Sequence, residues 1–147
     1  MYVFLDIDGV LNKKEQWSRL YYLDRECIKQ FCTFINEIRK DYVYIILTSS
    51  WRNGFISTKN KNNTPQIKQL EQMLGEYGVS IRGKVPIIKN GKRDDEIKEF
   101  MNLHSVENFI IIDDDKNEYS RINRYNYFTD SSTGFTKKDI KGCLKCI

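Results

Sequence analysis

The chain has 147 residues, 40% of them hydrophobic and 30% charged, which is the composition of a folded globular domain and not of a disordered segment. Its 8 glycines and 2 prolines exclude collagen-like and low-complexity architectures, and its apolar runs are far shorter than the roughly 20 residues of a membrane helix. No basic leader precedes the first apolar run, so we expect residues 1–147 to form one cytoplasmic domain without membrane contact.

The positive charge of the chain is concentrated in one part of the sequence. The whole chain has a net charge of +4, whereas residues 52–93 carry +7 and the remainder carries −3. The basic residues of this block are Arg52, Lys59, Lys61, Lys68, Arg82, Lys84, Lys89, Lys92 and Arg93. Such a block favours a polyanionic partner, a nucleic acid or a phosphate ester, although a solvated lysine-rich surface is the simpler alternative.

The four cysteines do not form the pattern of a disulfide scaffold. Cys143 and Cys146 have the C-x-x-C spacing of a redox or zinc site, and Cys27 and Cys32 form a second pair within a helical pattern. The five-residue spacing of that second pair is unusual for a zinc site. We therefore expect four reduced thiols, with Cys143 and Cys146 acting as small apolar residues on a C-terminal helix.

Apolar runs and polar segments alternate along the chain, and they predict strands and helices in turn. Tyr2–Leu5 is a short run that predicts a strand buried on both faces, and residues 12–23 are irregular. Asp24 can cap a helix whose apolar side chains recur with the 3.6-residue period. Tyr42–Leu47 is β-branched and aromatic and predicts the second strand, before a loop over residues 57–63.

The second half of the chain continues this alternation. Thr64 followed by Pro65 predicts the start of a helix, and Gly75 its end. Beyond it we expect two short extended pieces around Gly83, a helix, two strands and a final helix that opens with a capping box. These elements are Val79–Ile81, Val85–Ile88, about Asp94 to Leu103, Phe109–Ile112, Tyr127–Thr129, and the helix that begins with Thr136 and Asp139. Strands that alternate with helices predict an α/β fold with a mainly parallel sheet.

Acidic residues follow two of the expected strands, at the carboxyl edge of the sheet where ligands bind in α/β folds. The first strand runs into Asp6 and Asp8, with Gly9 permitting a turn, and Phe109–Ile112 runs into the three acids of 113–115. So many carboxylates at buried strand ends require a cation or a proton-transfer task, because unpaired carboxylates repel one another and resist desolvation. Hard oxygen ligands in this number favour Mg²⁺.

Hydroxyl and basic side chains accompany these acids. The second strand ends in Thr48 and Ser49, while Lys92 and Arg93 lie just before a helix whose N-terminal amides suit an anion. Acid pair, hydroxyl, cation and second acid pair supply the nucleophile, proton donor, oxygen clamp, charge neutraliser and metal ligands of phosphoryl transfer. Arg52 is a further candidate for a phosphate contact.

At these residues the chain resembles the haloacid dehalogenase (HAD) superfamily, whose four motifs occur in the same order. The segments that carry the resemblance are Phe4–Asn12 (FLDIDGVLN), Ile46–Thr48, Lys92 or Arg93, and Ile111–Asp114. Residues 48–52, 83–86 and 134–136 are similar to a subgroup of small HAD domains that includes the HAD domain of Swiss Army Knife RNA repair proteins. The resemblance spans nearly the whole chain and implies a three-layer Rossmann-like fold with a mainly parallel five-stranded sheet and no large cap domain.

The resemblance also implies a role for each residue that matches a motif. Asp6 attacks phosphorus and forms an aspartyl-phosphate, and Asp8 acts first as general acid and then as general base. Thr48 hydrogen-bonds a phosphoryl oxygen, and Lys92 offsets negative charge. The ligands of Mg²⁺ are Asp6, the backbone carbonyl of Asp8, and Asp113 or Asp114. HAD proteins that break carbon–halogen bonds lack the second acid, so Asp8 points to phosphate-ester hydrolysis.

Several assignments stay open at this stage. The cation of the third motif is Lys92 or Arg93, of which we choose Lys92, and Ser49 replaces Thr48 if the second strand is one residue longer. Thr48 could instead cap the strand end, and Asp115 could be a surface acid. The remaining candidates for contact with the phosphate are Gly9, Ser49, Arg52 and Arg93.

The substrate class follows from the short segments between the motifs. They leave no room for a cap domain of about 50 residues or more, so we expect an open site, suited to an RNA or DNA end given the basic block. Trp17, Tyr21, Tyr22 and Trp51 could stack bases, although such residues more often pack in the core. The alternatives are a phosphatase of small esters, nucleotides or phosphoproteins, and an inactive HAD-like domain that binds nucleic acid. A phospho-accepting receiver is disfavoured, because Thr48 stands where its acceptor aspartate would be.

Overall fold

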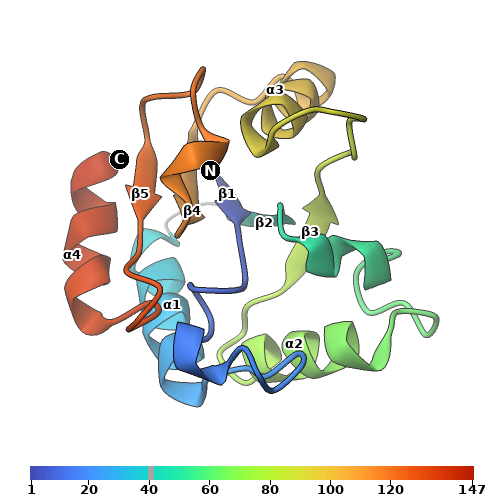
Figure 1. The fold of residues 1–147 in the computed structure, drawn as a ribbon, viewed down its shortest axis with the longest axis vertical. Coiled ribbons are helices and arrows are strands. Elements are labelled where there is room, and N and C mark those ends of the chain that lie inside the picture. The colour runs from blue at the N-terminus through green and yellow to red at the C-terminus, as the bar shows by residue number, and fades with distance from the viewer. Residues whose placement is uncertain (40–41) are drawn as a thin grey trace.

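The computed structural model describes residues 1–39 and 42–147. Its centre is a sheet of five parallel strands in the order β3-β2-β1-β4-β5 (Figure 1). The strands are β1 (Tyr2–Leu5), β2 (Tyr44–Leu47), β3 (Ile81–Lys84), β4 (Phe109–Asp113) and β5 (Asn126–Phe128). The helices are α1 (Arg25–Ile38), α2 (Pro65–Gly75), α3 (Arg93–His104) and α4 (Lys137–Cys146), with short 3₁₀ turns η1 (Lys14–Gln16), η2 (Ser50–Gly54) and η3 (Lys116–Glu118). The predicted α/β class with a parallel sheet is confirmed.

The helices cover the two faces of the sheet unequally and produce three layers. Helices α1, α2 and α4 pack on the face to which Val3 and Leu5 point, and α3 covers the opposite face around Phe4 (Figure 1). Because successive side chains of a strand point to opposite faces, β1 is apolar at every buried position. None of the helices described is both long enough and apolar enough to cross a membrane.

Local capping signals place the helix starts as the sequence predicts. The Asp24 carboxylate accepts hydrogen bonds from the backbone N–H groups of Glu26 and Cys27, each at 3.0 Å, at the start of α1. The predicted proline occupies the first turn of α2. Before α4, the Asp139 carboxylate accepts from the Thr136 backbone N–H at 2.6 Å, which confirms the predicted capping box.

The structure departs from the sequence prediction around β3. A single strand runs through Gly83, where the sequence predicts two shorter pieces on either side of it. The pairing of β3 with β2 shifts register between Ile45 and Ile46, and a Cβ on Gly83 would lie 3.3 Å from the Ile46 side chain. Glycine therefore lets the two strands approach closely, which is a tertiary requirement without a local sequence signal. Strand β2 begins at Tyr44, two residues later than predicted.

The segments in which a cap domain could be inserted are short. Residues 6–24, between β1 and α1, contain only η1, and residues 48–80, between β2 and β3, contain η2 and α2. Helix α2 buries Ile67 and Leu70 in the core beneath the sheet, so it belongs to a layer of the fold. These segments therefore contain no cap domain, as predicted, and the carboxyl edge of the sheet is left open.

The cysteines are packing residues. Cys27, Cys32 and Cys143 are buried, Cys146 is half-buried, and none of the four forms a disulfide. Burial raises the pKa of the Cys27 and Cys32 thiols to about 12, which disfavours the thiolate that metal binding and redox chemistry require. Cys143 and Cys146 lie on α4, the predicted C-terminal helix.

Candidate active site

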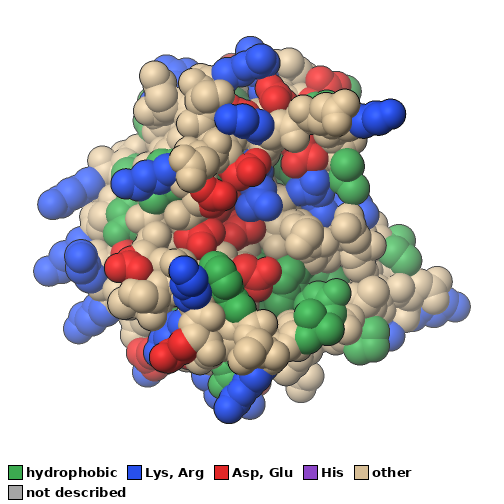
Figure 2. Space-filling model, viewed as in Figure 1, with side chains coloured by type: hydrophobic (Ala, Val, Ile, Leu, Met, Phe, Trp, Pro, Cys, Tyr) green, Lys and Arg blue, Asp and Glu red, His purple; other side chains and the backbone are tan. Residues whose placement is uncertain are grey.

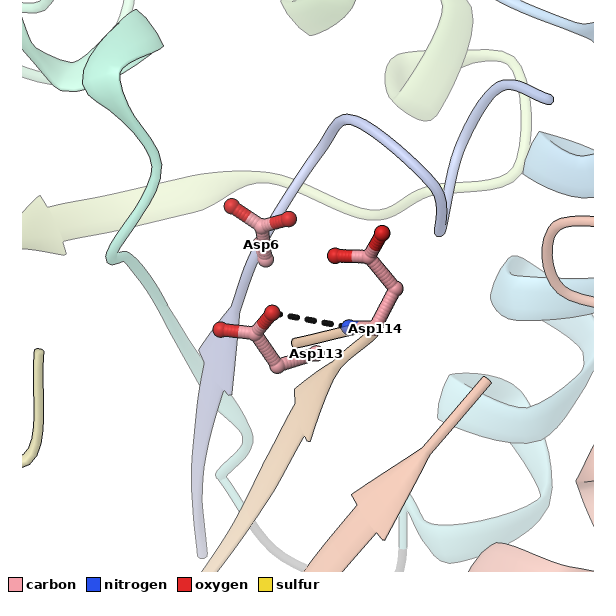
Figure 3. A group of neighbouring side chains, drawn as sticks. All are labelled: Asp6, Asp113 and Asp114. Carbon is pink, nitrogen blue, oxygen red and sulfur yellow. Dashed lines mark hydrogen bonds between the residues drawn. The ribbon is translucent and has the colours of Figure 1, made fainter. Parts of the chain in front are cut away.

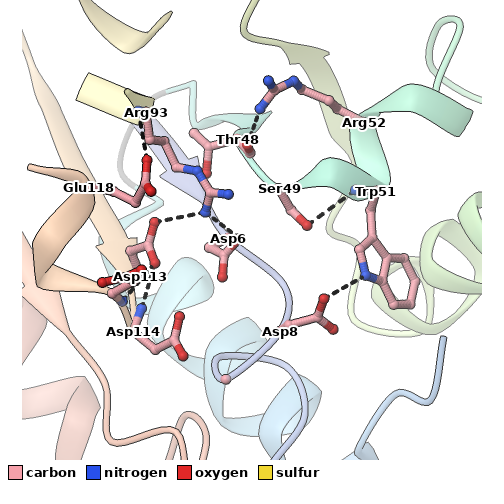
Figure 4. Close-up of polar contacts among 12 residues, drawn as sticks. Asp6, Asp8, Thr48, Ser49, Trp51, Arg52, Arg93, Asp113, Asp114 and Glu118 are labelled. Carbon is pink, nitrogen blue, oxygen red and sulfur yellow. Dashed lines mark hydrogen bonds and ion pairs between the residues drawn. The ribbon is translucent and has the colours of Figure 1, made fainter. Parts of the chain in front are cut away.

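Polar side chains are held at the carboxyl edge of the sheet, where β1, β2 and β4 end (Figure 4). Asp6 and Thr48 each continue the hydrogen-bonded ladder one residue beyond their strands. The Asp6 N–H donates to the Ile112 carbonyl at 3.0 Å, and the Thr48 N–H donates to the Leu5 carbonyl at 2.9 Å. Asp113 is itself the last residue of β4. The sheet therefore fixes the backbone from which each of these side chains projects.

Three carboxylates meet at this edge. Asp6, Asp113 and Asp114 each offer an oxygen atom, and the three oxygens lie within 4.8 Å of one another (Figure 3). Burial, reinforced by the negative charge of Asp113, raises the pKa of Asp6 well above its ordinary value and raises that of Asp114 to about 6. Carboxylates this close repel one another, so the cluster becomes fully ionised only beside additional positive charge.

One basic side chain is directed into the carboxylate cluster. Arg93 Nη1 donates to Asp6 Oδ1 at 2.7 Å and to Asp113 Oδ2 at 3.0 Å (Figure 4). Burial alone would lower the pKa of Arg93, but the two carboxylates outweigh it and raise this pKa, so the guanidinium stays charged. Within the described part of the chain, one positive charge faces three carboxylates, which leaves room for a further cation.

The structure corrects the choice of Lys92 as the cation of the third motif. Lys92 precedes α3 and is exposed, and its Nζ donates to the Asn117 carbonyl at 3.3 Å instead of to an acid. Arg93 is the first residue of α3, and its backbone N–H donates to the Glu118 carboxylate at 3.1 Å. Lys92 has an extended backbone before the helix and Arg93 begins the helix, so the two side chains point in different directions, and Arg93 is the one that faces the acids.

The two acids at the end of β4 have different surroundings. Asp113 Oδ1 accepts from the N–H groups of Asp114 and Asp115, at 2.7 and 3.0 Å, and its Oδ2 accepts from Arg93 and from the Tyr119 hydroxyl, at 3.0 and 2.7 Å. No residue in the described ranges donates a hydrogen bond to the Asp114 carboxylate, which lines the pocket. Asp113 therefore positions its neighbours, and Asp114 is the carboxylate with more freedom to contact a ligand. No local sequence pattern marks Tyr119 as part of the site.

A buried asparagine holds the turn that follows β1. Asn12 Nδ2 donates to Asp8 Oδ1 at 2.8 Å, and Asn12 Oδ1 accepts from the Gly9 N–H at 2.9 Å. The indole N–H of Trp51 donates to Asp8 Oδ2 at 3.4 Å. Asp8 thus lies in the wall of the pocket, beside the carboxylate cluster and not within it (Figure 4).

Gly9 brings this turn against Asp114. Its φ of 82° lies in the left-handed region that favours glycine. A Cβ at this position would lie 2.2 Å from Asp114 Oδ2, a distance that no side chain could adopt without displacing the carboxylate. Gly9 therefore forms the predicted turn, and because it has no side chain the Asp114 carboxylate can lie directly against its backbone.

Two residues with hydroxyl groups lie between β2 and η2. Thr48 Oγ1 is buried and has no hydrogen-bond partner among the described residues, whereas Ser49 Oγ accepts from the Trp51 N–H at 3.2 Å. Strand β2 ends at Leu47, so Thr48 takes the position directly after the strand and Ser49 lies in the pocket wall. A buried hydroxyl without a partner costs about 1–3 kcal/mol, so the Thr48 hydroxyl is a group that a ligand could satisfy.

These side chains border an open pocket of about 390 Å³. Asp6, Asp8 and Asp114 give it an acidic floor, and Arg93 and Ser49 add donors to its walls. Figure 2 shows the acidic side chains gathered at the centre of this face, with basic side chains next to them. An acidic site with one arginine and free hydroxyls suits a phosphate that binds together with a metal ion.

A sequence profile of one protein family matches nearly the whole chain. The family is described as the HAD domain in Swiss Army Knife RNA repair proteins, and the match covers residues 2–140. The chain belongs to this family. No curated protein and no solved structure matches the chain. Membership indicates hydrolase chemistry of the phosphatase type for this HAD domain, whose matched region holds all five strands and every residue of the pocket.

Arg52 does not line the acidic pocket of the HAD domain, contrary to the sequence prediction of a phosphate contact. Its Nη2 donates to Glu96 Oε2 at 2.6 Å, its Nη1 donates to the Thr48 carbonyl, and both charged side chains are buried. Figure 4 shows the guanidinium directed to the Thr48 backbone, with no dashed line to Asp6. The partner of Arg52 lies 44 residues further along the chain, on α3, and is not evident from the sequence around residue 52.

The basic block of residues 52–93 does not form one surface. Lys84 Nζ donates to the carbonyls of Arg52 and Phe55, at 3.2 and 2.6 Å, and so serves the fold. Arg82 lines a hollow together with Arg39 near the starts of β2 and β3, at the sheet edge opposite the site. The prediction of a polyanion partner from this block is therefore not supported by a continuous basic patch.

Proposed function

We propose that this HAD domain is a Mg²⁺-dependent phosphohydrolase with Asp6 as its nucleophile. The observation that carries the proposal is the convergence of Asp6, Asp113 and Asp114 beside Arg93 in an open pocket. Oxygen donors with raised pKa values and too little neighbouring positive charge fit a divalent ion, and Asp6 and Asp114 would hold it. When bound, Mg²⁺ supplies positive charge that offsets the phosphate and the attacking carboxylate.

In the first step, Asp6 attacks the phosphorus atom of a phosphate monoester. The new bond forms between Asp6 Oδ2 and phosphorus, because Arg93 holds Oδ1, and the bond from phosphorus to the ester oxygen breaks. Asp8 donates a proton to that oxygen, so the leaving group departs as an alcohol. The phosphoryl group remains on Asp6 as an aspartyl-phosphate.

In the second step, water cleaves the aspartyl-phosphate. Asp8, now a carboxylate, takes a proton from the water as the water oxygen attacks phosphorus, and inorganic phosphate and the Asp6 carboxylate are released. Asn12 and Trp51 each donate a hydrogen bond to one oxygen of Asp8, which orients its carboxylate for this task. Both acids return to their starting states.

The hydroxyl of Thr48 completes the phosphate site in this proposal. It is buried directly after β2, one strand away from Asp6, and it lacks a partner among the described residues. A phosphoryl oxygen that accepts from Thr48 Oγ1 would satisfy this group and fix the orientation of the phosphate.

We further propose that the phosphate is that of a polynucleotide end. Two observations support this substrate class: the family is that of the HAD domain in RNA repair proteins, and the pocket lies at an open sheet edge without a cap domain. An open site accepts a group at the end of a long chain, whereas a small metabolite is usually enclosed.

The test is hydrolysis of a generic aryl phosphate by the full chain with and without Mg²⁺. We expect activity that requires the ion, and a loss of about 1,000-fold or more in kcat in Asp6→Asn, since the nucleophile is removed. Glu99→Gln, which changes an exposed acid on α3, is the matched control and should retain full activity. Undiminished activity in Asp6→Asn would refute the assignment of the nucleophile.

A further inference from the structure

A groove leads from the phosphate pocket along the segment between β1 and α1. The pocket shares Asp8, Trp17 and Ser50 with a second hollow of about 370 Å³, whose walls also include Tyr21 and Trp51. The two together have the size and the mixed polar and aromatic lining of an organic ligand site. Figure 2 shows hydrophobic side chains gathered directly beside and below the acidic centre of this face.

Two aromatic side chains of the groove are exposed, whereas seven phenylalanines and Trp51 are buried in the core. Trp17 is 42% exposed and Tyr21 is 41% exposed. Trp51 is buried, which agrees with the alternative prediction that such aromatic residues pack in the core. The Tyr21 ring meets the Trp51 ring edge to face, with centroids 5.2 Å apart and planes at 87°. Trp51 thus supports Tyr21 from beneath and leaves the tyrosine partly open to solvent.

Hydrogen bonds connect the wall of the groove to the turn after β1 that contains Asp8. Trp17 Nε1 donates to Asn12 Oδ1 at 2.9 Å, and Asn12 Nδ2 donates both to Asp8 and to the Tyr22 carbonyl, the latter at 3.0 Å. Tyr21 has a φ of 59°, a left-handed conformation that costs a non-glycine residue about 1 kcal/mol or more. The aromatic rings are therefore held in one arrangement next to the proton donor.

We propose that this groove binds the terminal, unpaired nucleoside of a polynucleotide end, as the leaving group of the reaction; the inference rests on the proposed phosphohydrolase function. Asp8 lies in the walls of both the phosphate pocket and the groove, which is where the ester oxygen between phosphate and leaving group must lie. An exposed indole or phenol face stacks any base, and stacking requires a base that is free of its partner strand.

Charge in the groove favours a nucleoside within a chain over another aromatic leaving group. Arg19 lines the groove, is exposed, and has its guanidinium 5.3 Å above the centre of the Tyr22 ring. A guanidinium in this place can pair with the next phosphate of the chain. A phosphotyrosine peptide would offer no anion at a fixed distance from the ring.

The test measures kcat/KM for four substrates: an RNA hexamer with a 3′-phosphate, the same hexamer with a 5′-phosphate, a blunt duplex of the better hexamer, and glycerol 2-phosphate. The wild type should prefer one single-stranded hexamer to both the duplex and the small ester. Trp17→Ala and Tyr21→Ala should each lower the ratio of hexamer to glycerol 2-phosphate by about tenfold to a hundredfold, and Trp17→Phe should restore most of it.

Tyr125→Ala is the matched control. Tyr125 is 39% exposed, has a φ of 60°, and packs edge to face on Phe109, with centroids 5.4 Å apart, so it resembles Tyr21 in exposure, backbone conformation and ring packing. It precedes β5 at the edge of the sheet opposite the site. The substrate ratio should be unchanged in this variant.

The outcomes separate the groove from the chemistry. Any of three results would overturn the inference: an unchanged substrate ratio in both Trp17→Ala and Tyr21→Ala, a preference for the duplex, or a preference for a phosphotyrosine peptide over the hexamers. In each case, Mg²⁺-dependent cleavage of glycerol 2-phosphate would still support the proposed function. If the wild type cleaves none of the substrates, the proposed function fails. In that case, the affinities of wild type and Tyr21→Ala for the fluorescently labelled hexamers test whether the groove binds the nucleoside. Equal affinities would overturn the inference.

Discussion

The carboxylate cluster places three acids beside the guanidinium of Arg93. Arg93 bridges Asp6 and Asp113, while Asp114 has no donor among the described residues. Asp6 and Asp114 therefore keep raised pKa values, chiefly through burial and through the charge of Asp113. The residues that most need a cation are the two that the proposal gives to Mg²⁺.

The neighbouring basic residues at the start of α3 provide a matched pair of variants. Arg93→Ala should lower kcat/KM for an aryl phosphate by about 100-fold or more, because it removes the guanidinium that contacts Asp6, the proposed nucleophile. Lys92→Ala removes the same charge one residue earlier and should change kcat/KM less than threefold, since Lys92 Nζ donates to the Asn117 carbonyl and to no carboxylate among the described residues. Equal losses in the two variants would contradict the assignment of Arg93.

Asp113 and Asp114 should also separate in experiment. Asp113→Asn places an amide NH₂ opposite either two backbone N–H groups or Arg93 and Tyr119, so it should lower the free energy of unfolding by about 1–3 kcal/mol. Asp114→Asn meets no such donors and should keep the stability of the metal-free protein while raising the Mg²⁺ concentration needed for half-maximal activity. Denaturant unfolding and Mg²⁺ titrations measure the two effects, and the reverse pattern would exchange the roles of the two acids.

The sequence identifies most residues of the site, but it does not predict which of two adjacent residues makes a given contact. Strand ends that run into acids predict Asp6, Asp113 and Asp114, because β-strand patterns and hard oxygen donors are local signals. The choice between Lys92 and Arg93 depends on the direction of side chains around the first turn of α3, and the donors of Asp113 include a tyrosine six residues away. These are tertiary facts that spacing along the chain does not determine.

Among the elements, η2 and α3 are joined by a buried ion pair. Arg52 Nη2 on η2 lies 2.6 Å from Glu96 Oε2 on α3, and Glu96 Oε2 also accepts a hydrogen bond from the Ile88 N–H at 3.1 Å. The pair connects the segment after Thr48 to the helix that carries Arg93. It therefore fixes two walls of the site relative to each other without contacting the pocket.

Removing one partner of this pair should destabilise the protein strongly. Glu96→Ala should lower the free energy of unfolding by about 3–5 kcal/mol, because it leaves the Arg52 guanidinium buried without a counter-charge. The double variant Arg52→Met with Glu96→Leu should recover much of that loss, since it buries no charge. Chemical denaturation of the three proteins measures the difference. A Glu96→Ala protein as stable as the wild type would contradict the buried pair.

Helices and most strands are predictable because their signals are local. Asp24, Thr64 with Pro65, and Thr136 with Asp139 mark the starts of α1, α2 and α4, and the structure confirms each. Strand β3 is the exception. Its path is set by the contact between Gly83 and Ile46 on the neighbouring strand, and its four residues (IRGK) contain one apolar side chain, which is too little to show the pattern of a buried strand.

At the scale of the whole molecule, the parallel sheet gathers distant segments at one open edge. Motifs that are more than 100 residues apart, from Asp6 to Asp114, meet there because β1 and β4 are neighbouring parallel strands. The same fold disperses the basic block, placing Arg93 in the site, Arg52 in the interior and Arg82 at the opposite edge. Charge counted along the sequence therefore misjudges the surface, whereas strand ends predict the site.

The central claim is that a divalent ion binds between Asp6 and Asp114. The most direct measurement is anomalous X-ray scattering from crystals of the protein soaked with Mn²⁺, which takes the same oxygen ligands as Mg²⁺. We expect one strong peak in contact with carboxylate oxygens of both residues, and no peak at this place in Asp114→Asn. The absence of a peak in the wild type at saturating Mn²⁺, or a peak elsewhere only, would contradict the account.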